Sequence, residues 1–292
     1  MGSLFNAIAK KAIGQAILWT IILWSDQTLS DNFLSIEYSK KNQIRTGMIW
    51  IKFKPKLILS EKGRKRKKDS FRNKDSGQQA KPVSEDLMKD TLPYSAIGKL
   101  FFTTGYGQVG SCSAAFVGGG SIVTTAAHCV MTSTGDWNTD FIFVRSYGSA
   151  DQEVYAIQCV AVPEKWGEVI GDSVLNHDYA FLRTNRKSNV GSLGITNGDP
   201  PQRINIVGYS DNIEDGRRML SLSTEIIKID ASRLGSKDNP FGSGNSGAPW
   251  LDVSTVYSVS SYYKDDQRSI MWGPRLRGQT TELVNFVANG CR

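Results

Sequence analysis

The chain of 292 residues is poor in the residues that metal and redox sites need, with only two histidines and four cysteines. No two cysteines form a C-x-x-C pair, which argues against a zinc ribbon and against a thioredoxin-type motif. An even number of isolated cysteines instead predicts two disulfides and an oxidising compartment. The alternative is four buried free thiols in a cytosolic protein.

Long apolar runs are also lacking. Residues 12–24 form an apolar run of 13 residues behind Lys10 and Lys11, shorter than the roughly 20 residues of a membrane-spanning helix. The run has the length of a signal-peptide core behind a positive flank, although no A-x-A cleavage site follows it. We therefore expect a signal peptide or an uncleaved anchor, and any membrane association to come through these residues. An amphipathic surface helix, or a start codon placed too early, would be the other interpretations.

The net charge of +7 is unevenly distributed along the chain. Residues 1–90 hold 18 Lys and Arg against 9 Asp and Glu, whereas residues 91–292 hold 17 against 19. The basic character belongs to the leader, so the folded body is not expected to bind nucleic acid. Residues 61–90 are polar, with a basic run at 64–68, and predict a disordered propeptide or linker. A polyanion-binding or nuclear-targeting patch, a processing site and a plain solvated charge run are the alternatives.

From residue 91 onward, short apolar stretches rich in β-branched and aromatic residues alternate with Gly-, Asn-, Asp- and Ser-rich breaks. Strand-length segments of this kind predict an all-β sandwich or a pair of barrels. Only a turn after Ala127 and residues 281–290 read as helical.

One hairpin is informative for the cysteines. Residues 112–117 and 121–127 flank a Gly-Gly-Gly turn, so that Cys112 and Cys129 can come within bridging distance. A disulfide there would close a loop of 16 residues, worth about 3 kcal/mol on the chain-entropy model. By elimination, Cys159 and Cys291 form the second pair, which would tie the C-terminal helix to a strand of the first lobe.

Three segments carry the chemistry. His128 follows a strand in TTAAHC, and Ser246 lies in the glycine-rich FGSGNSGAP segment. A serine nucleophile needs a base within hydrogen-bond reach and a third group that orients the base. The loop around Ser246 would supply the backbone N–H groups of Gly244 and Ser246 as an oxyanion hole.

The third group is predicted to be Asp178, at the start of the apolar strand in HDYAFL. Asp140 and Asp172 are the fallback candidates. The fifth residue of the G-x-S-x-G nucleophile elbow would be Ala248 here, so an α/β-hydrolase is not indicated.

TTAAHC, HDYAFL and GNSGAP, in the order His, Asp, Ser, resemble the motifs of the chymotrypsin- and trypsin-like serine proteases. The resemblance covers roughly residues 92–292, and GNSGAP is most similar to the glutamyl endopeptidase (V8-like) branch. It implies two antiparallel six-stranded β-barrels, an active site in the cleft between them and a C-terminal helix, behind a largely irregular leader. The domains would be residues 1–90, 91–195 and 196–292.

The sequence departs from the family at the positions that set activation and specificity. Digestive members have an Asp before the serine that pairs with a newly freed N-terminus, whereas this chain has Asn245. The acidic residue six positions before the serine in trypsin is Pro240 here, and no His follows His177, so neither Lys/Arg nor Glu specificity carries over. Ser260, Ser261, Tyr262 and Lys264 are expected near the pocket wall.

The resemblance implies a secreted, monomeric serine endopeptidase, made as a zymogen, that cleaves proteins or peptides without a metal or cofactor. Ser246 would attack, His128 would move the proton and Asp178 would orient His128. The competing functions are a non-catalytic binding protein on the same scaffold and a membrane-tethered protease or basic-leader interaction protein that keeps residues 1–90.

Overall fold

The computed structural model describes residues 32–35, 43–45, 48–52, 58–61, 79–168, 172–228, 230–263 and 270–292. The apolar run at 12–24 and the basic run at 64–68 lie outside the described residues. None of the helices in the described part of the chain is both long and apolar enough to cross a membrane.

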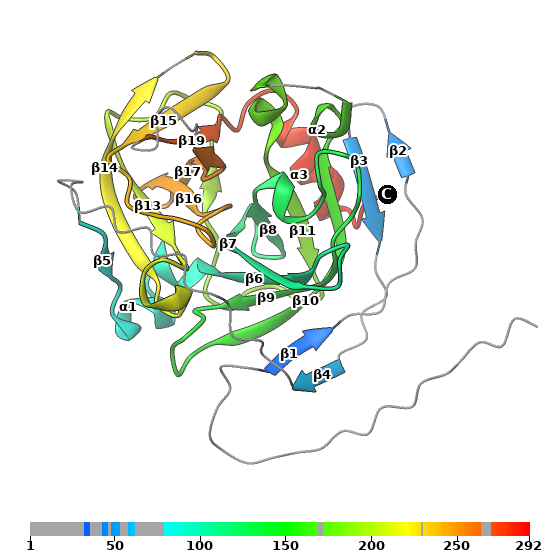
Figure 1. Cartoon of the computed structure of the whole chain (residues 1–292), viewed down its shortest axis with the longest axis horizontal. Helices are drawn as coiled ribbons and strands as arrows, with labels where there is room; N and C mark the ends of the chain where they lie inside the picture. Colours follow the sequence, from blue (N-terminus) through cyan, green and yellow to red (C-terminus); the bar gives the residue numbers. More distant parts are fainter. Residues whose placement is uncertain are drawn as a thin grey trace, which may run out of the picture.

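Two β-sheets build the body of the protein and lie side by side in Figure 1. In the first sheet, β11 pairs with both β8 and β10, so six strands close into a barrel in the order β11-β8-β7-β6-β9-β10. This confirms the first predicted barrel. Its strands are β6 (Ile97–Thr103), β7 (Val109–Val117), β8 (Ile122–Thr125), β9 (Thr139–Arg145), β10 (Glu153–Pro163) and β11 (Ala180–Thr184).

Aromatic side chains fill this barrel. The ring of Phe116 on β7 meets Phe143 and Tyr155 edge-on, at centroid distances of 5.0 and 4.8 Å. All three are fully buried, and edge-to-face packing of this kind favours one fixed arrangement of the rings. The barrel is therefore a firm support for the loops at its ends.

The second sheet does not close into the predicted second barrel. It has nine strands, and its two ends, β12 and β18, are not paired with each other. Closure would require β17 to pair with β19. On the edge of β17 that faces away from β16, Thr255 and Val256 pair with β12 instead, and one isolated bridge joins Ser258 to Arg275, the residue after β19. The strands are β5 (Lys81–Pro82), β12 (Gly194–Ile195), β13 (Arg203–Gly208), β14 (Leu220–Lys228), β15 (Arg233–Lys237), β16 (Pro249–Asp252), β17 (Thr255–Val259), β18 (Tyr262–Tyr263) and β19 (Ile270–Pro274).

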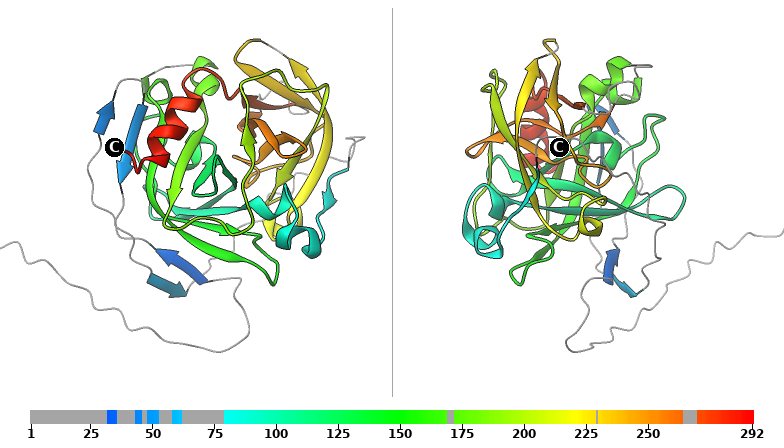
Figure 2. Two further views of the ribbon diagram at one scale, coloured as in Figure 1. Left: turned by 180° about the vertical axis from the view of Figure 1, so that it is seen from behind. Right: turned by 60° about the vertical axis from the view of Figure 1, so that its left-hand side comes forward.

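The C-terminal helix is present as predicted. Helix α3 (Thr280–Ala288) buries Leu283, Phe286 and Val287 and lies against β10 and β11 of the first barrel, as Figure 2 shows from behind. The remaining helical elements are α1 (Glu85–Asp90), α2 (Lys165–Glu168), η1 (Tyr94–Ala96), η2 (Ala127–Cys129), η3 (Asp172–His177) and η4 (Glu214–Gly216).

Where the structure describes the leader, it contains several short strands. Strand β3 (Met48–Lys52) pairs with residues 159–163 of β10, beyond the end of β9, and β2 (Gln43–Arg45) pairs with β3. A separate two-stranded sheet joins β1 (Asn32–Ser35) to β4 (Ile58–Glu61). Further along, β5 pairs with β14. Backbone pairing with the body therefore begins well before residue 91, and the proposed domain boundaries remain a prediction.

Candidate active site

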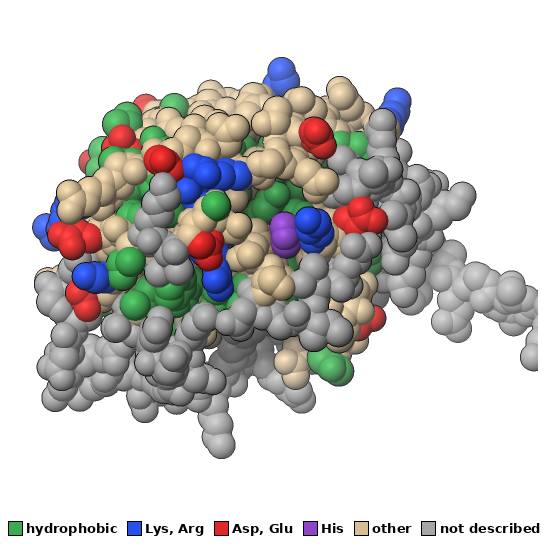
Figure 3. All heavy atoms as spheres, turned by 90° about the horizontal axis from the view of Figure 1, so that it is seen from above, with side chains coloured by type: hydrophobic (Ala, Val, Ile, Leu, Met, Phe, Trp, Pro, Cys, Tyr) green, Lys and Arg blue, Asp and Glu red, His purple; other side chains and the backbone are tan. Residues whose placement is uncertain are grey.

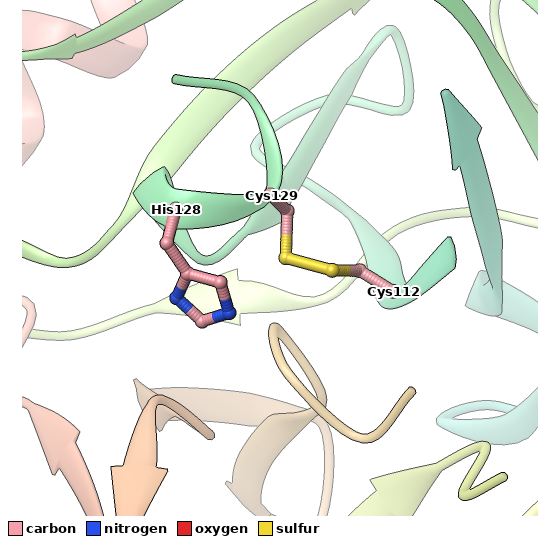
Figure 4. Close-up of side chains that lie close together, drawn as sticks. All are labelled: Cys112, His128 and Cys129. Atoms are coloured by element: carbon pink, nitrogen blue, oxygen red, sulfur yellow. A yellow bond between two sulfur atoms is a disulfide. The ribbon is translucent and has the colours of Figure 1, made fainter. Parts of the chain in front are cut away.

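His128 lies in the turn that follows β8. Cys129, the next residue, is bonded to Cys112 on β7 with a Cα–Cα distance of 6.3 Å, and its carbonyl accepts a hydrogen bond from Asn138 Nδ2 at 3.0 Å. Figure 4 shows the imidazole and this disulfide projecting from the same turn. The disulfide thus fixes the backbone immediately after His128.

Cys112, His128 and Cys129 bring a nitrogen and two sulfurs within 4.8 Å of one another. Both sulfurs are consumed in the disulfide, and metal binding by cysteine requires a thiolate. This trio is therefore not a metal site.

Asp178 meets His128 because of the pairing of their strands. In the antiparallel register of β11 and β8, Ala180 lies opposite Thr125, so the residues just before β11 and just after β8 gather at one end of the barrel. There Asp178 Oδ1 accepts the backbone N–H of His128 at 2.8 Å, and Oδ2 lies 2.7 Å from Nδ1. The carboxylate is fully buried, whereas the imidazole is 36% exposed.

This pair shifts both pKa values. Burial alone would lower the pKa of His128, but the charge of Asp178 and the hydrogen bond to it raise that pKa above its ordinary value of 6.5. Burial alone would raise the pKa of Asp178, but the His128 charge and the hydrogen bonds from His128 and Ser261 lower it. The arrangement therefore favours an ionised Asp178 and stabilises an imidazolium at His128.

Ser261 is a further member of this group. It follows β17 in the second sheet, its backbone N–H donates to Trp272 (2.9 Å), and its Oγ makes a short hydrogen bond to Asp178 Oδ2. The sequence predicts only that Ser261 lies near the pocket wall, because nothing local to the Ser260–Ser261 pair points to a residue 83 positions away.

The loop that carries Ser246 packs against β7 and against the residues just before His128. The carbonyl of Ser246 accepts the N–H of Ser113 on β7 at 2.8 Å. Gly247 has φ +79°, and a Cβ added there would lie 2.1 Å from Thr125 Oγ1 and 2.9 Å from the nitrogen of Ala126. Only glycine fits at this position, and it seats the loop against the chain two residues before His128.

The loop leaves two backbone donors available. Among the hydrogen bonds of the described residues, the N–H groups of Gly244 and Ser246 have no protein acceptor. Between them, Asn245 is buried, and its Oδ1 accepts a hydrogen bond from Ser260 Oγ at 2.9 Å. Figure 3 shows one face of the molecule, on which charged side chains of both signs are scattered among polar and hydrophobic atoms.

Residues 112–256 match the family described as "Trypsin-like peptidase domain". This part of the chain is similar to the trypsin-like peptidase family. The comparison with curated protein sequences gave no match.

Solved structures agree with this assignment. The crystal structure of protease Anisep from Arthrobacter nicotinovorans is similar at 27% identity, covering 73% of this chain and 99% of that chain, with a TM-score of 0.60. The thermostable serine protease AL20 from an extremophilic microorganism matches at 24% identity over 70% and 99% of the two chains, with a TM-score of 0.60. A Glu endopeptidase in complex with MPD matches at 18% identity over 74% and 98%, with a TM-score of 0.59. The last two share the fold alone.

Among the described residues, the candidates Asp140, His177 and Tyr262 make no hydrogen bond to His128 or Asp178. Asp140 on β9 accepts a hydrogen bond from its neighbour Thr139. His177 is half-buried, and burial, followed by the charge of Lys165, lowers its pKa. Tyr262 stacks on Trp272 with ring centroids 6.5 Å apart. The side chain of Asp172 and all of Lys264 lie outside the described residues.

Proposed function

We propose that this protein is a serine endopeptidase with His128, Asp178 and Ser246 as its triad. The observation that carries the proposal is the two-point contact of the buried Asp178 carboxylate with His128. Such a contact fixes the tautomer of the imidazole, leaving Nε2 to accept a proton. Gly247 packs closely against Ala126, two residues before His128, and this contact supports its neighbour Ser246 as the source of that proton.

The reaction follows from these positions. As His128 Nε2 takes the proton of Ser246, Oγ bonds to the carbonyl carbon of the peptide. The N–H groups of Gly244 and Ser246 stabilise the oxyanion. The C–N bond then breaks, and the leaving amine receives the proton from His128. Water, deprotonated by His128, attacks the acyl-enzyme. The bond between the acyl carbon and Ser246 Oγ then breaks, the carboxylic acid leaves, and His128 returns the proton to Ser246 Oγ. The nucleophile, the base and the two oxyanion donors all belong to this chain.

Labelling with a fluorophosphonate probe tests the assignment. Wild type should be labelled covalently, and Ser246→Ala should not be labelled. Ser223→Ala, an exposed serine on β14, is the matched control and should be labelled like wild type. Equal labelling of wild type and Ser246→Ala would overturn the assignment of the nucleophile. A folded wild type that neither reacts nor cleaves a broad peptide library would favour the binding-protein alternative.

We further propose that the protein is secreted and that its leader is removed. The two disulfides, Cys112–Cys129 and Cys159–Cys291, support an oxidising compartment. Mass spectrometry of the mature N-terminus is the test. A start near residues 80–92 would support removal of a propeptide, whereas an intact Met1 would support an anchored protein that keeps its leader.

A further inference from the structure

The residue before the proposed nucleophile, Asn245, is buried and uncharged. Its Oδ1 accepts from Ser260 Oγ, which in turn accepts the indole N–H of Trp250 at 2.9 Å. Among the described residues, nothing accepts a hydrogen bond from Asn245 Nδ2. A neutral amide offers no charge to a chain-terminal ammonium, so other contacts must hold residues 242–246.

One of these contacts orients the peptide between Ser243 and Gly244. The carbonyl of Ser243 accepts the backbone N–H of Asp211 at 2.7 Å. In a trans peptide, C=O and N–H point in opposite directions. The bond to Asp211 therefore turns the N–H of Gly244 away from Asp211 and keeps it available as an oxyanion donor.

The carboxylate of Asp211 also packs against the Cα of Gly244, on the side where a side chain would project. A Cβ added to Gly244 would lie 2.6 Å from Asp211 Oδ1 and 2.9 Å from its Cγ. The position of the Asp211 side chain thus limits where the Gly244 backbone can move.

Lys99, on β6 of the first barrel, forms an ion pair with Asp211. Its ammonium lies 3.5 Å from Asp211 Oδ1 and donates to the carbonyl of Gly216 at 2.9 Å. The Lys99 side chain is 6% exposed and lies near the rings of Phe101 and Tyr147, 5.8 and 5.5 Å from their centroids. A buried ammonium is costly unless it is paired and hydrogen-bonded. Lys99 therefore ties the turn at residues 211–216 to the first barrel.

We propose that Lys99 is a positioning residue, which acts through Asp211 to hold the Gly244 N–H in the oxyanion hole. The proposal rests on the proposed function and deepens it. An internal ammonium, present in the folded chain from the outset, would then set the oxyanion loop, and no ammonium from a chain terminus would be needed.

The test measures kcat and KM for p-nitrophenyl acetate with the full chain. Losing one oxyanion donor outright lowers kcat by about 10²–10³-fold, so loosening it in Lys99→Met should lower kcat by about 10–100-fold. KM should change less than about twofold, because a donor that acts in the transition state adds little to ground-state binding. Lys99→Arg keeps the charge and should recover most of the activity.

Asp211→Asn and the double variant show whether the two residues act as a unit. Asp211→Asn keeps the backbone N–H but removes the ion pair, and should lower kcat with KM unchanged. The double variant should be no worse than Lys99→Met alone, since removing both partners leaves no uncompensated charge. Lys187→Met, at an exposed lysine, is the matched control. Additive losses would mean that Lys99 and Asp211 act separately, which would overturn the proposal.

Four further outcomes are decisive. A folded Lys99→Met variant with kcat within about twofold of wild type overturns the proposal. If Lys99→Met does not fold, Asp211→Asn decides by the same criterion. Two residues added before the N-terminus of the isolated protein should leave kcat unchanged, whereas a loss would mean that a free terminus sets the loop. A wild type that does not react with a fluorophosphonate would instead overturn the proposed function.

Discussion

Asp178 contacts His128 at two atoms: its Oδ1 accepts the backbone N–H of His128 at 2.8 Å, and its Oδ2 lies 2.7 Å from Nδ1. One contact fixes where the residue sits and the other fixes which ring nitrogen carries the proton. A carboxylate this deeply buried is stable only because it is fully hydrogen-bonded.

Asp178→Asn should lower kcat by roughly 10⁴-fold, because an amide that donates toward Nδ1 favours the wrong imidazole tautomer. Steady-state hydrolysis of p-nitrophenyl acetate measures the effect. Asp140→Asn is the matched control, since Asp140 contacts Thr139 and not His128. A larger loss from Asp140→Asn than from Asp178→Asn would contradict the assignment.

The pH dependence of kcat/KM should follow His128. The imidazole accepts the serine proton only when it is neutral, so kcat/KM should fall as the pH falls through the pKa of His128. Burial lowers that pKa, but the charge of Asp178 and the hydrogen bond to it together outweigh burial, so the midpoint in the free enzyme should lie above 6.5. A pH–rate profile checks this, and a midpoint below 6.5 would contradict it.

Ser261→Ala should lower kcat by a few-fold to tenfold, since a hydrogen bond to a charged group contributes about 1.5–3 kcal/mol, of which water can replace part. The hydroxyl helps to lower the pKa of Asp178, so its loss should raise that pKa. The acid limb of stability should then shift to higher pH. Asp178 contributes stability above its unfolded pKa and loses that contribution as pH falls through its folded pKa. Ser261→Thr, which keeps the hydroxyl, is the control; an unchanged acid limb in Ser261→Ala would be contrary to expectation.

Gly247→Ala should abolish activity and strongly destabilise the protein. The new methyl group would meet Thr125 Oγ1 at 2.1 Å and the carbonyl of Ser113 at 2.4 Å. Gly107→Ala separates this clash from the backbone cost. Gly107 also has positive φ, +71°, but nothing lies within 4 Å of an added Cβ. The control should lose only about 1–2 kcal/mol and keep full activity. Thermal unfolding of both variants decides, and similar losses would contradict the packing argument.

Replacing Cys112 and Cys129 together by Ala should lower the free energy of unfolding by about 3 kcal/mol and lower kcat as well, because the bridge adjoins His128. The double replacement of Cys159 and Cys291, which join β10 to the chain three residues after the end of α3, should destabilise the protein with a smaller effect on kcat. Denaturant titration and kcat, measured on both variants, check the pair. Equal effects on kcat would mean that the Cys112–Cys129 bridge has no particular role at His128.

Local patterns sufficed where the relevant contacts are close in the sequence. The Gly-Gly-Gly hairpin predicted the Cys112–Cys129 neighbourhood, and the apolar strand after Asp178 favoured that residue as the partner of His128. The predicted second barrel was wrong as a closed structure, because the short β12 occupies the edge of β17 that closure would need. No short stretch of the sequence indicates which of β12 and β19 pairs with β17.

The sequence by itself determined the all-β character, the Cys112–Cys129 pair and the order of His128, Asp178 and Ser246, since each depends on residue types and on local spacing. The Cys159–Cys291 pair, 132 positions apart, followed from it only by elimination. Only the tertiary structure decided that Ser261 reaches Asp178 and that Lys99 pairs with Asp211. Those contacts join residues 83 and 112 positions apart, across the two sheets. They depend on how the sheets pack against each other, which no short stretch of sequence encodes.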